Sequence, residues 1–351
     1  MPNFTPETLR KIGRAFFEAA GCRPADAAVV VDHLVESNLF GHDSHGAIRF
    51  YDYGRGIREG RFQTQATPVI DRQTSSTAVV DGQAALGPIG ATFAAELAID
   101  KAREHGIAAV ALRNTCHIGR VGAYPLMAAR QGLIGQIMVN AGRLGFEIAP
   151  FGGIDGRLSS NPIAFAAPRR NADPVMMDMT TSVAAVGKIW VAENRGQQLP
   201  EGWIIDAEGR PTTDPKDFTQ EPRGAMLPLG GVAAHKGSGL AVMVELLGGA
   251  LGGQGCAAGE REVVSNGVLM TVYRIDQFTD ADAYYDQVES LIRHVKSSRL
   301  APGFDQILFP GEIEFAQARR KQADGIDVED ATWRKICAEA RHFGLDLARW
   351  Q

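Results

Sequence analysis

Apolar side chains recur every three or four positions through roughly the first sixty residues, which is the spacing of one buried helical face. Thr5 and Pro6 open the first such segment, and a polar cap followed by proline is typical of a helix start. The pattern predicts helices from Pro6 to about Gly21, from Pro24 to Gly41 and from Ser44 to about Gly60. The N-terminal part is therefore expected to be an all-helical layer.

Further along the chain, short runs of β-branched and apolar residues alternate with helical periodicity, which indicates an α/β fold class. The expected strands cover residues 77–82, 107–112, 133–140, 175–179 and 267–273. The expected helices cover residues 87–105, 119–131, 183–194 and 240–251, with Thr180 to Ser182 as a candidate N-cap for the third of them.

Residues 196–228 are polar and rich in proline and glycine, so they are expected to leave the sheet as a long excursion. Helical periodicity returns at residues 280–296 and again from residues 313 and 328. Because both ends of the chain are helical, the closing helices are expected to pack against the opening ones. We therefore expect a helical domain from residues 1–72 plus 280–351 and a central α/β domain over residues 73–279.

Composition narrows the class of protein. The 351 residues are 45% hydrophobic and 22% charged, with a formal net charge of -5. Lysine and arginine are spread along the chain, which argues against nucleic acid as a partner. There is no apolar run near the roughly 20 residues that a membrane span needs, and residues 1–5 lack the basic and apolar regions of a signal peptide. The expected location is the cytoplasm, without membrane association.

The four cysteines lie far apart and form no CxxC pair, which argues against a zinc knuckle and a disulfide framework. Cys116 stands beside His117 and has two interpretations, a nucleophile or a buried small thiol. The buried thiol is favoured.

The candidate chemistry begins at Ser44. If Ser44 caps a helix, His45, Arg49 and Tyr53 follow at i, i+4 and i+8 and share one face. A planar guanidinium suits a carboxylate, and an imidazole suits proton transfer to a carbonyl or alkoxide. This face indicates chemistry on a 2-oxo or 2-hydroxy acid, unless His45 and Arg49 are only solvated and Tyr53 only packs.

A second interpretation of the same stretch is a metal site. His42 and His45 stand at i and i+3 with Asp43 between them, and His117 could complete the set. That set would belong to a metal-dependent lyase or hydrolase, although neither an HExxH motif nor clustered cysteines accompany it.

The sequence lacks a convincing dinucleotide fingerprint, since the nearest GxGxx(G/A) match follows a helix instead of a strand. Lys236 precedes a predicted helix within a glycine-rich turn, which could cradle a phosphate. The same glycines could equally serve only for close packing.

With these residues laid out, the chain resembles the malate/L-lactate dehydrogenase family, which is separate from the Rossmann-fold lactate and malate enzymes. That family also includes ureidoglycolate, sulfolactate and 2,3-diketogulonate oxidoreductases and a cyclic imino-acid reductase. The matching segments are Asp43 to Gly46 with Arg49 and Tyr53, His117 to Tyr124, Pro150 to Gly153, Ser160 to Phe165, Asp178 to Ser182, Leu199 to Trp203, and His235 to Gly237.

The resemblance implies an NAD- or NADP-dependent oxidoreductase and a homodimer. Its cofactor domain would be non-Rossmann, with a largely antiparallel sheet, and both chain termini would form a helical domain. By resemblance, the catalytic residues are His45, Arg49, Ser44 and Tyr53, with His117 as a second candidate for the acid/base and His45 favoured. The cofactor-binding positions that carry over are Asn140, Asn161, Asp178, Met179, Thr180, Thr181, Ser182, His235, Lys236, Pro310, Gly311 and Glu312.

One local departure concerns Phe50, Tyr51 and Asp52, which stand where members of this family often carry Leu-Pro before the tyrosine. The wall of the substrate pocket is therefore expected to differ. Two further alternatives use the same residues: reduction of a cyclic 2-imino acid, and a non-catalytic protein that only binds a nicotinamide nucleotide.

Overall fold

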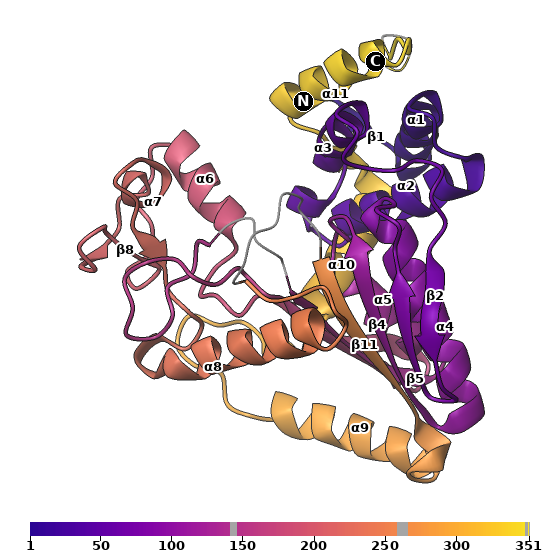
Figure 1. The fold of residues 1–351 in the computed structure, drawn as a ribbon. Helices are drawn as coiled ribbons and strands as arrows, with labels where there is room; N and C mark the ends of the chain where they lie inside the picture. Colours follow the sequence, from indigo (N-terminus) through magenta and orange to yellow (C-terminus); the bar gives the residue numbers. More distant parts are fainter. Residues whose placement is uncertain (141–145, 258–265, 348–349, 351) are drawn as a thin grey trace.

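The computed structural model describes residues 1–140, 146–257, 266–347 and 350 (Figure 1). A seven-stranded sheet forms its centre, in the order β2-β3-β4-β11-β5-β6-β7. Among the described strands of this sheet, only β3 and β4 pair in parallel, and every other neighbouring pair is antiparallel. The strands are β2 (Val69–Gln73), β3 (Thr77–Asp81), β4 (Ile107–Thr115), β5 (Leu133–Asn140), β6 (Ile163–Arg169), β7 (Ala172–Met179) and β11 (Asn266–Arg274).

This topology confirms a mixed α/β fold with a largely antiparallel, non-Rossmann sheet. The last strand in sequence, β11, inserts between β4 and β5 and pairs with both along most of its length. A Rossmann sheet instead joins parallel strands through crossover helices. The absence of a dinucleotide fingerprint in the sequence agrees with this arrangement.

Helices cover both faces of the sheet (Figure 1). On one face, α4 (Gly87–His105) and α5 (Ala123–Ala129) bury small and apolar side chains against the strands. Alanines dominate the inner side of α4, so its backbone can lie close to the sheet. On the opposite side lie α8 (His235–Val244), the π-helix Glu245–Ala250 that continues it, and α9 (Ala281–Lys296).

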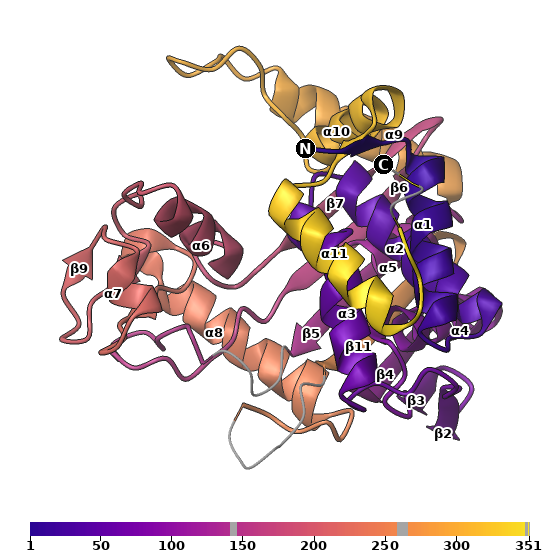
Figure 2. The same ribbon diagram turned by 90° about the horizontal axis from the view of Figure 1, so that it is seen from above.

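The two ends of the chain meet in a helical layer. Here α11 packs on α3 and α10 on α2, as the sequence predicts for its opening and closing helices. Figure 2 shows both termini on this side of the molecule. The layer contains α1 (Pro6–Ala19), α2 (Pro24–Leu39), α3 (Ile48–Arg58), α10 (Glu312–Asp324), α11 (Asp330–His342) and the two-stranded sheet of β1 (Asn3–Phe4) and β12 (Ile326–Asp327).

The division into two domains stays a prediction, and two elements cross its expected boundaries. Helix α9, which the sequence groups with the terminal helices, contacts β6 of the central sheet, and its last residue Lys296 also pairs with Glu312 of α10. Strand β2 begins at Val69, inside the part of the chain expected to be helical, and pairs with β3.

The polar excursion has structure of its own. It contains a three-stranded sheet of β8 (Ile204–Ile205), β9 (Pro211–Thr212) and β10 (Ala225–Met226), together with α7 (Lys216–Thr219). These pack with α6 (Val186–Asn194) around a separate apolar cluster that includes Ile189, Ile204 and Phe218. In Figure 1 this lobe stands to one side of the central sheet.

Several helix boundaries differ from the sequence prediction, among them that of the helix expected over residues 119–131, which spans only Ala123–Ala129. Helix α6 begins at Val186 with Ala185 as its N-cap, so Thr180 to Ser182 do not cap it. The hydroxyl of Ser182 instead donates to the carbonyl of Ala184, which closes a local turn before the helix. The apolar helix expected from residue 240 begins earlier, at His235, and becomes a π-helix at Glu245.

Candidate active site

The predicted helix from Ser44 is wrong in its first turn. Residues Asp43–His45 form a 3₁₀ turn, and α3 begins only at Ile48 with Ala47 as its N-cap. The cause is a tertiary contact: the side-chain oxygen of Asn38 accepts the Ala47 N–H at 2.7 Å. A Cβ on Gly46 would lie 2.2 Å from that same oxygen, so the break requires glycine. His45 therefore does not share a helical face with Arg49 and Tyr53.

His45 and Tyr53 nevertheless belong to one cluster, because each contacts His117. The imidazole rings of His45 and His117 stack with centroids 5.3 Å apart and planes 19° apart. The Tyr53 hydroxyl lies 2.9 Å from Nδ1 of His117 and 2.9 Å from the carbonyl oxygen of the same residue. Two segments that are 64 residues apart in sequence thus build one cluster of proton-transfer groups.

These contacts determine which nitrogen of His117 carries a proton. The carbonyl oxygen can only accept, so the Tyr53 hydroxyl donates to it, and the Tyr53 oxygen then accepts from Nδ1–H of His117. Nε2 of His117 is left with its lone pair. By contrast, Nδ1 of His45 is buried and has no hydrogen-bond partner among the residues that the structure describes.

Burial keeps both imidazoles uncharged. Loss of solvent, and secondarily the positive charge of Arg49, lowers the pKa of His45 to about 3. The same two causes bring the pKa of His117 well below its ordinary value. Burial also raises the pKa of Tyr53. All three groups are therefore neutral near pH 7 in this structure.

Arg49 lies at the edge of the cluster and is already engaged. Its Nε donates to the carbonyl oxygen of Ser44 at 2.8 Å, and its Nη1 donates to a carboxylate oxygen of Asp52 at 2.8 Å. The Arg49 and Asp52 side chains are 29% and 36% exposed, so solvent or a ligand can reach the pair. Ser44 thus contributes its backbone to Arg49, and Asp52 places a negative charge where a substrate carboxylate is expected.

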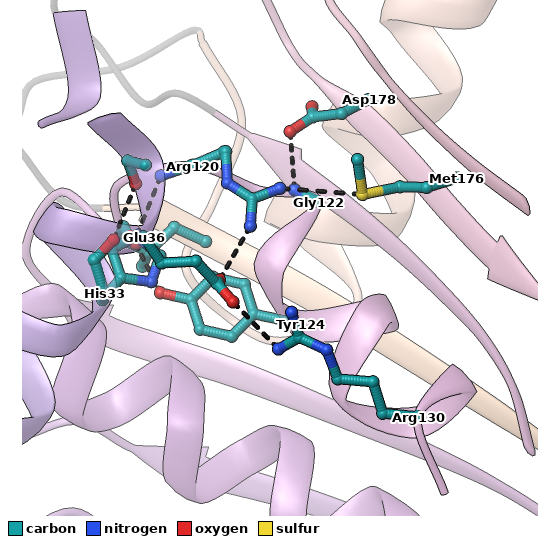
Figure 3. A network of polar contacts seen from close by, with 10 residues as sticks. His33, Glu36, Arg120, Gly122, Tyr124, Arg130, Met176 and Asp178 are labelled. Carbon is teal, nitrogen blue, oxygen red and sulfur yellow. Dashed lines mark hydrogen bonds and ion pairs between the residues drawn. The ribbon is translucent and has the colours of Figure 1, made fainter. Parts of the chain in front are cut away.

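A buried network that the sequence did not reveal supports the His117 segment (Figure 3). The guanidinium of Arg120 is completely buried and donates to Glu36 at 2.8 Å, while its carbon lies 4.5 Å from the ring centroid of Phe40. The backbone N–H of Arg120 donates to Nε2 of His33 at 2.9 Å. The loop that carries His117 is therefore attached to α2 through the contacts of Arg120 with His33 and Glu36.

One carboxylate, that of Glu36, lies between two guanidinium groups in this network. Burial opposes the ionisation of Glu36, but the guanidinium groups of Arg120 and Arg130 outweigh it and lower the pKa of Glu36. Burial, with Arg120 as the next cause, lowers the pKa of His33 to about 3, so His33 is a neutral acceptor. Its ring also stacks on Tyr124 with centroids 5.3 Å apart.

Several cofactor candidates from distant parts of the chain adjoin one another. A carboxylate oxygen of Asp178 accepts the Gly122 N–H at 2.7 Å, which joins the end of β7 to the His117 loop. The carbonyl of Pro310 accepts the Met176 N–H at 3.2 Å, and a Cβ added to Gly311 would lie 3.1 Å from that nitrogen. Pro310 and Gly311 thus lie against Met176, two residues before Asp178.

Backbone hydrogen bonds connect the Asp178–Ser182 segment to the residues that precede His235 and Lys236. The N–H of Thr181 donates to Ser160, and the carbonyl of Thr181 accepts from Leu229. Gly237 lies so close to Leu229 that a Cβ would stand 2.1 Å from its carbonyl oxygen. Close packing is therefore one role of the glycines after Lys236, and the exposed Lys236 side chain is free of that constraint.

Asn140 and Asn161 have a different environment, because both side chains are fully buried. Each donates its amide to Glu245, in the case of Asn161 at 2.7 Å. The same carboxylate accepts the Ala257 N–H at 2.8 Å. Glu245 was missed in the sequence, where its only signal is a single acidic residue inside the apolar run of residues 240–251.

Glu312 lies at the start of α10 and is likewise engaged. It accepts from Lys296 at 2.5 Å and from the Phe309 N–H at 2.9 Å. Although burial opposes it, the hydrogen bond from Lys296 contributes most to lowering the pKa of Glu312.

Comparison with known proteins identifies the family. The model of the malate/L-lactate dehydrogenase family matches residues 4–337. The chain belongs to the malate/L-lactate dehydrogenase family. This membership confirms the resemblance and the prediction of a 2-hydroxy acid dehydrogenase.

Relatives in this family cover nearly the whole chain. Hydroxycarboxylate dehydrogenase B of Escherichia coli is 36% identical over 97% of this chain and 94% of its own length. The solved structure of sulfolactate dehydrogenase from Methanocaldococcus jannaschii superposes with a TM-score of 0.88 at 32% identity, covering 98% of each chain. That of Δ1-piperideine-2-carboxylate reductase from Pseudomonas syringae gives a TM-score of 0.84 at 28% identity, covering 97% of this chain and all of the other.

Two further observations concern other classes of protein. Of the helices in the described parts of the chain, none combines the length and apolar character needed to cross a membrane. Within residues 1–140, 146–257, 266–347 and 350, no three or more His, Cys, Asp or Glu side chains gather so that they could hold a metal ion.

Cys116 is a free, buried thiol, and burial raises its pKa to about 12, which agrees with the packing role favoured from sequence.

Proposed function

We propose that this member of the malate/L-lactate dehydrogenase family transfers a hydride between NAD(P)H and a small 2-oxo or 2-hydroxy carboxylic acid. The observation that carries the proposal is the cluster of His45, His117 and Tyr53 beside the accessible guanidinium of Arg49. Such a cluster offers a proton-transfer group and a carboxylate anchor on the same side of a small substrate.

His117 is the stronger candidate for the acid/base, although the sequence favoured His45. A catalytic base works best when a third group fixes its orientation and tautomer, and Tyr53 does this for His117. Nε2 of His117 is then ready to accept the proton of a hydroxyl group, or to return one to the oxygen of a carbonyl. Nδ1 of His45, which is buried and has no hydrogen-bond partner within the described parts of the chain, is available to hydrogen-bond the same oxygen.

Arg49 would bind the substrate carboxylate. Two of its three guanidinium nitrogens already donate within the chain, so the substrate would use Nη2 together with an N–H shared with Ser44 or Asp52. The Asp52 carboxylate offsets the positive charge of Arg49, so the two side chains together carry little net charge before a substrate binds.

The residues around the cluster fit a nicotinamide nucleotide. The bound cofactor would supply or accept the hydride. Nδ1 of His45, buried and without a partner among the residues described, supports a ligand at this place. The proposed cofactor residues are Asn140, Asn161, Asp178 to Ser182, His235, Lys236 and Pro310 to Glu312. The exposed cation of Lys236 suits a diphosphate, whereas the buried Asn140 and Asn161 would act by supporting the neighbouring backbone through Glu245.

Reduction of a cyclic 2-imino acid is the second candidate. It is supported by the similarity to Δ1-piperideine-2-carboxylate reductase along the whole chain. A cyclic imino acid presents a carboxylate next to a C=N bond, so it would use the same guanidinium and the same proton donor.

We also propose that the protein is a homodimer. Helix α8 and the π-helix after it expose large apolar side chains, a composition that a partner surface of the same kind would cover. These side chains are Val242, Met243 and Leu246, and Leu251 directly after the π-helix is exposed as well. Light scattering coupled to size-exclusion chromatography tests this state, and a monomer at micromolar concentration would contradict it.

A spectrophotometric panel tests the function. Pyruvate, oxaloacetate, other small 2-oxo acids and a cyclic 2-imino acid are each assayed with NADH and with NADPH. Oxidation of either nucleotide by a member of the panel is expected, and it should persist in the presence of a chelator. Bound metal and a chelator-sensitive cleavage of these acids, without oxidation of either nucleotide, would favour the metal-dependent lyase or hydrolase class. Nucleotide binding without turnover would favour a binding protein.

A further inference from the structure

The 3₁₀ turn that carries His45 is tied to the C-terminal part of the chain by Lys321. The ammonium of Lys321 donates to both carboxylate oxygens of Asp43, at 2.9 and 3.1 Å. It also donates to the backbone carbonyl of Asn38 at 2.9 Å. The Lys321 side chain is only 16% exposed, whereas the Asp43 side chain is 60% exposed, so the ion pair is shielded from solvent on its Lys321 side only.

Asn38 links the ion pair to the backbone on the far side of His45. Its side-chain amide donates to Asp43 at 2.6 Å, and its side-chain oxygen accepts the Ala47 N–H at 2.7 Å. The turn is therefore held at both ends, at Asp43 before His45 and at Ala47 after it. Lys321 completes the set of donors around the Asp43 carboxylate.

Helix α10, which carries Lys321, is itself firmly mounted. Phe315 packs on Phe40, directly after α2, with ring centroids 5.2 Å apart. At the start of the helix, Pro310 and Gly311 lie against Met176 at the edge strand β7. One helix therefore spans from the proposed cofactor segment 310–312 to the turn that carries His45.

We propose that Lys321 is a positioning residue for the catalytic turn: through Asp43 it fixes the place of His45 next to His117. The inference rests on the proposed function, because it assigns a role in the same site. Lys321 does not touch the reacting atoms in this account. Its loss should reduce turnover by displacing His45 while leaving the cofactor segments intact, because misplacement of a reacting group lowers the rate more than binding.

The experiment compares K321M, K321R and the matched control R320M, whose wild-type side chain is exposed and bonds only to Gln317 among the described residues. We expect K321M to lower kcat by up to about 10-fold, and by no more than H45N does, with the cofactor Kd changed less than about twofold. K321R, which keeps the charge and several donors, should recover most of kcat, and R320M should match the wild type. An equal kcat for K321M and R320M would overturn the inference.

A double-mutant cycle and hydrogen exchange separate this role from a general loss of stability. If Lys321 acts through Asp43, K321M should have little further effect on kcat in the D43N background. Amide exchange in a peptide spanning residues 38–47 should rise in K321M and stay normal in R320M. Unchanged exchange in K321M would contradict the proposal that Lys321 holds the Asp43–His45 turn in place, whether or not the enzyme turns over. Faster exchange in K321M, combined with a wild-type protein that shows no turnover, would refute only the proposed function.

Discussion

The hydroxyl of Tyr53 lies 2.9 Å from Nδ1 of His117 and 2.9 Å from its carbonyl oxygen. One hydroxyl therefore fixes both the ring and the backbone of the residue to which we assign proton transfer. Y53F removes both hydrogen bonds while keeping the buried ring. We expect kcat to fall about 10-fold, in line with the loss of about one to two kcal/mol of hydrogen bonding. Cofactor affinity should stay unchanged.

The matched control for that variant is Y51F, whose wild-type ring contacts Arg55 and Lys335 away from His117. Stopped-flow single-turnover kinetics measure both variants. A kcat for Y53F equal to that of Y51F would mean that His117 needs no orienting partner.

The two stacked histidines can be told apart by separate replacement. H117N should lower kcat by about 100-fold or more, the usual contribution of a general acid or base, and H45N should have a smaller effect. Both should bind the nicotinamide nucleotide with nearly normal affinity, which fluorescence titration measures. A larger loss in H45N would return the acid/base role to His45, as the sequence favoured.

Asp52 competes with a substrate carboxylate for Arg49. D52N keeps the shape and an acceptor oxygen but removes the charge, so the KM for an acid substrate should fall by about two- to fivefold, as expected for a partly exposed ion pair of up to about 1 kcal/mol. The effect should shrink at high salt because screening weakens the pair. KM measured at low and high ionic strength checks this, and an increase in KM would show that Asp52 instead holds Arg49 in place. The comparison variant R49K should raise KM, since an ammonium lacks the guanidinium fork.

His33 makes the protein sensitive to acid. Burial lowers its pKa to about 3 in the folded state, with Arg120 acting in the same direction and Glu36 against it. The unfolded chain therefore binds a proton first as the pH falls below about 6.5. The free energy of unfolding should then fall by about 1.4 kcal/mol per pH unit for this one residue. Above about pH 6.5 His33 is neutral in both the folded and the unfolded state, so it no longer lowers the free energy of unfolding.

H33Q offers an acceptor oxygen to the Arg120 N–H and cannot titrate. Urea unfolding at several values between pH 7 and pH 4 should show a smaller pH slope for H33Q than for the wild type, by about one proton. Identical slopes would mean that the acid sensitivity comes from other groups, such as His45 and His117.

Local sequence patterns were enough to predict most of the elements. The helix at the N-terminus begins where Thr5 and Pro6 indicate, and the Thr5 hydroxyl accepts the Thr8 N–H at 3.1 Å as its cap. Strand β5 spans Leu133–Asn140, as its alternating apolar pattern predicts. The order of strands could not be predicted this way, because the insertion of β11 between β4 and β5 depends on pairing between distant segments.

The candidate site shows the same division. Its residue types and the family resemblance were available in the sequence, but its geometry was not. The prediction that His45, Arg49 and Tyr53 share one helical face was wrong. The Asn38 side-chain oxygen accepts the Ala47 N–H, so the 3₁₀ turn ends before α3 begins. The partners of His117, Arg49 and Arg120 are Tyr53, Asp52 and Glu36, and only the folded chain shows which of these pairs form.

The strand pair of Asn3–Phe4 with Ile326–Asp327 has a consequence for biosynthesis. During translation, the N-terminal helices emerge long before residues 326–327 leave the ribosome, and contacts between distant segments form slowly because the intervening loop must close first. The apolar surface that α2 and α3 present to α10 and α11 therefore stays uncovered through most of synthesis. A nascent chain of this protein is thus expected to need protection by a chaperone, and it should acquire activity only after the residues of α11 are released.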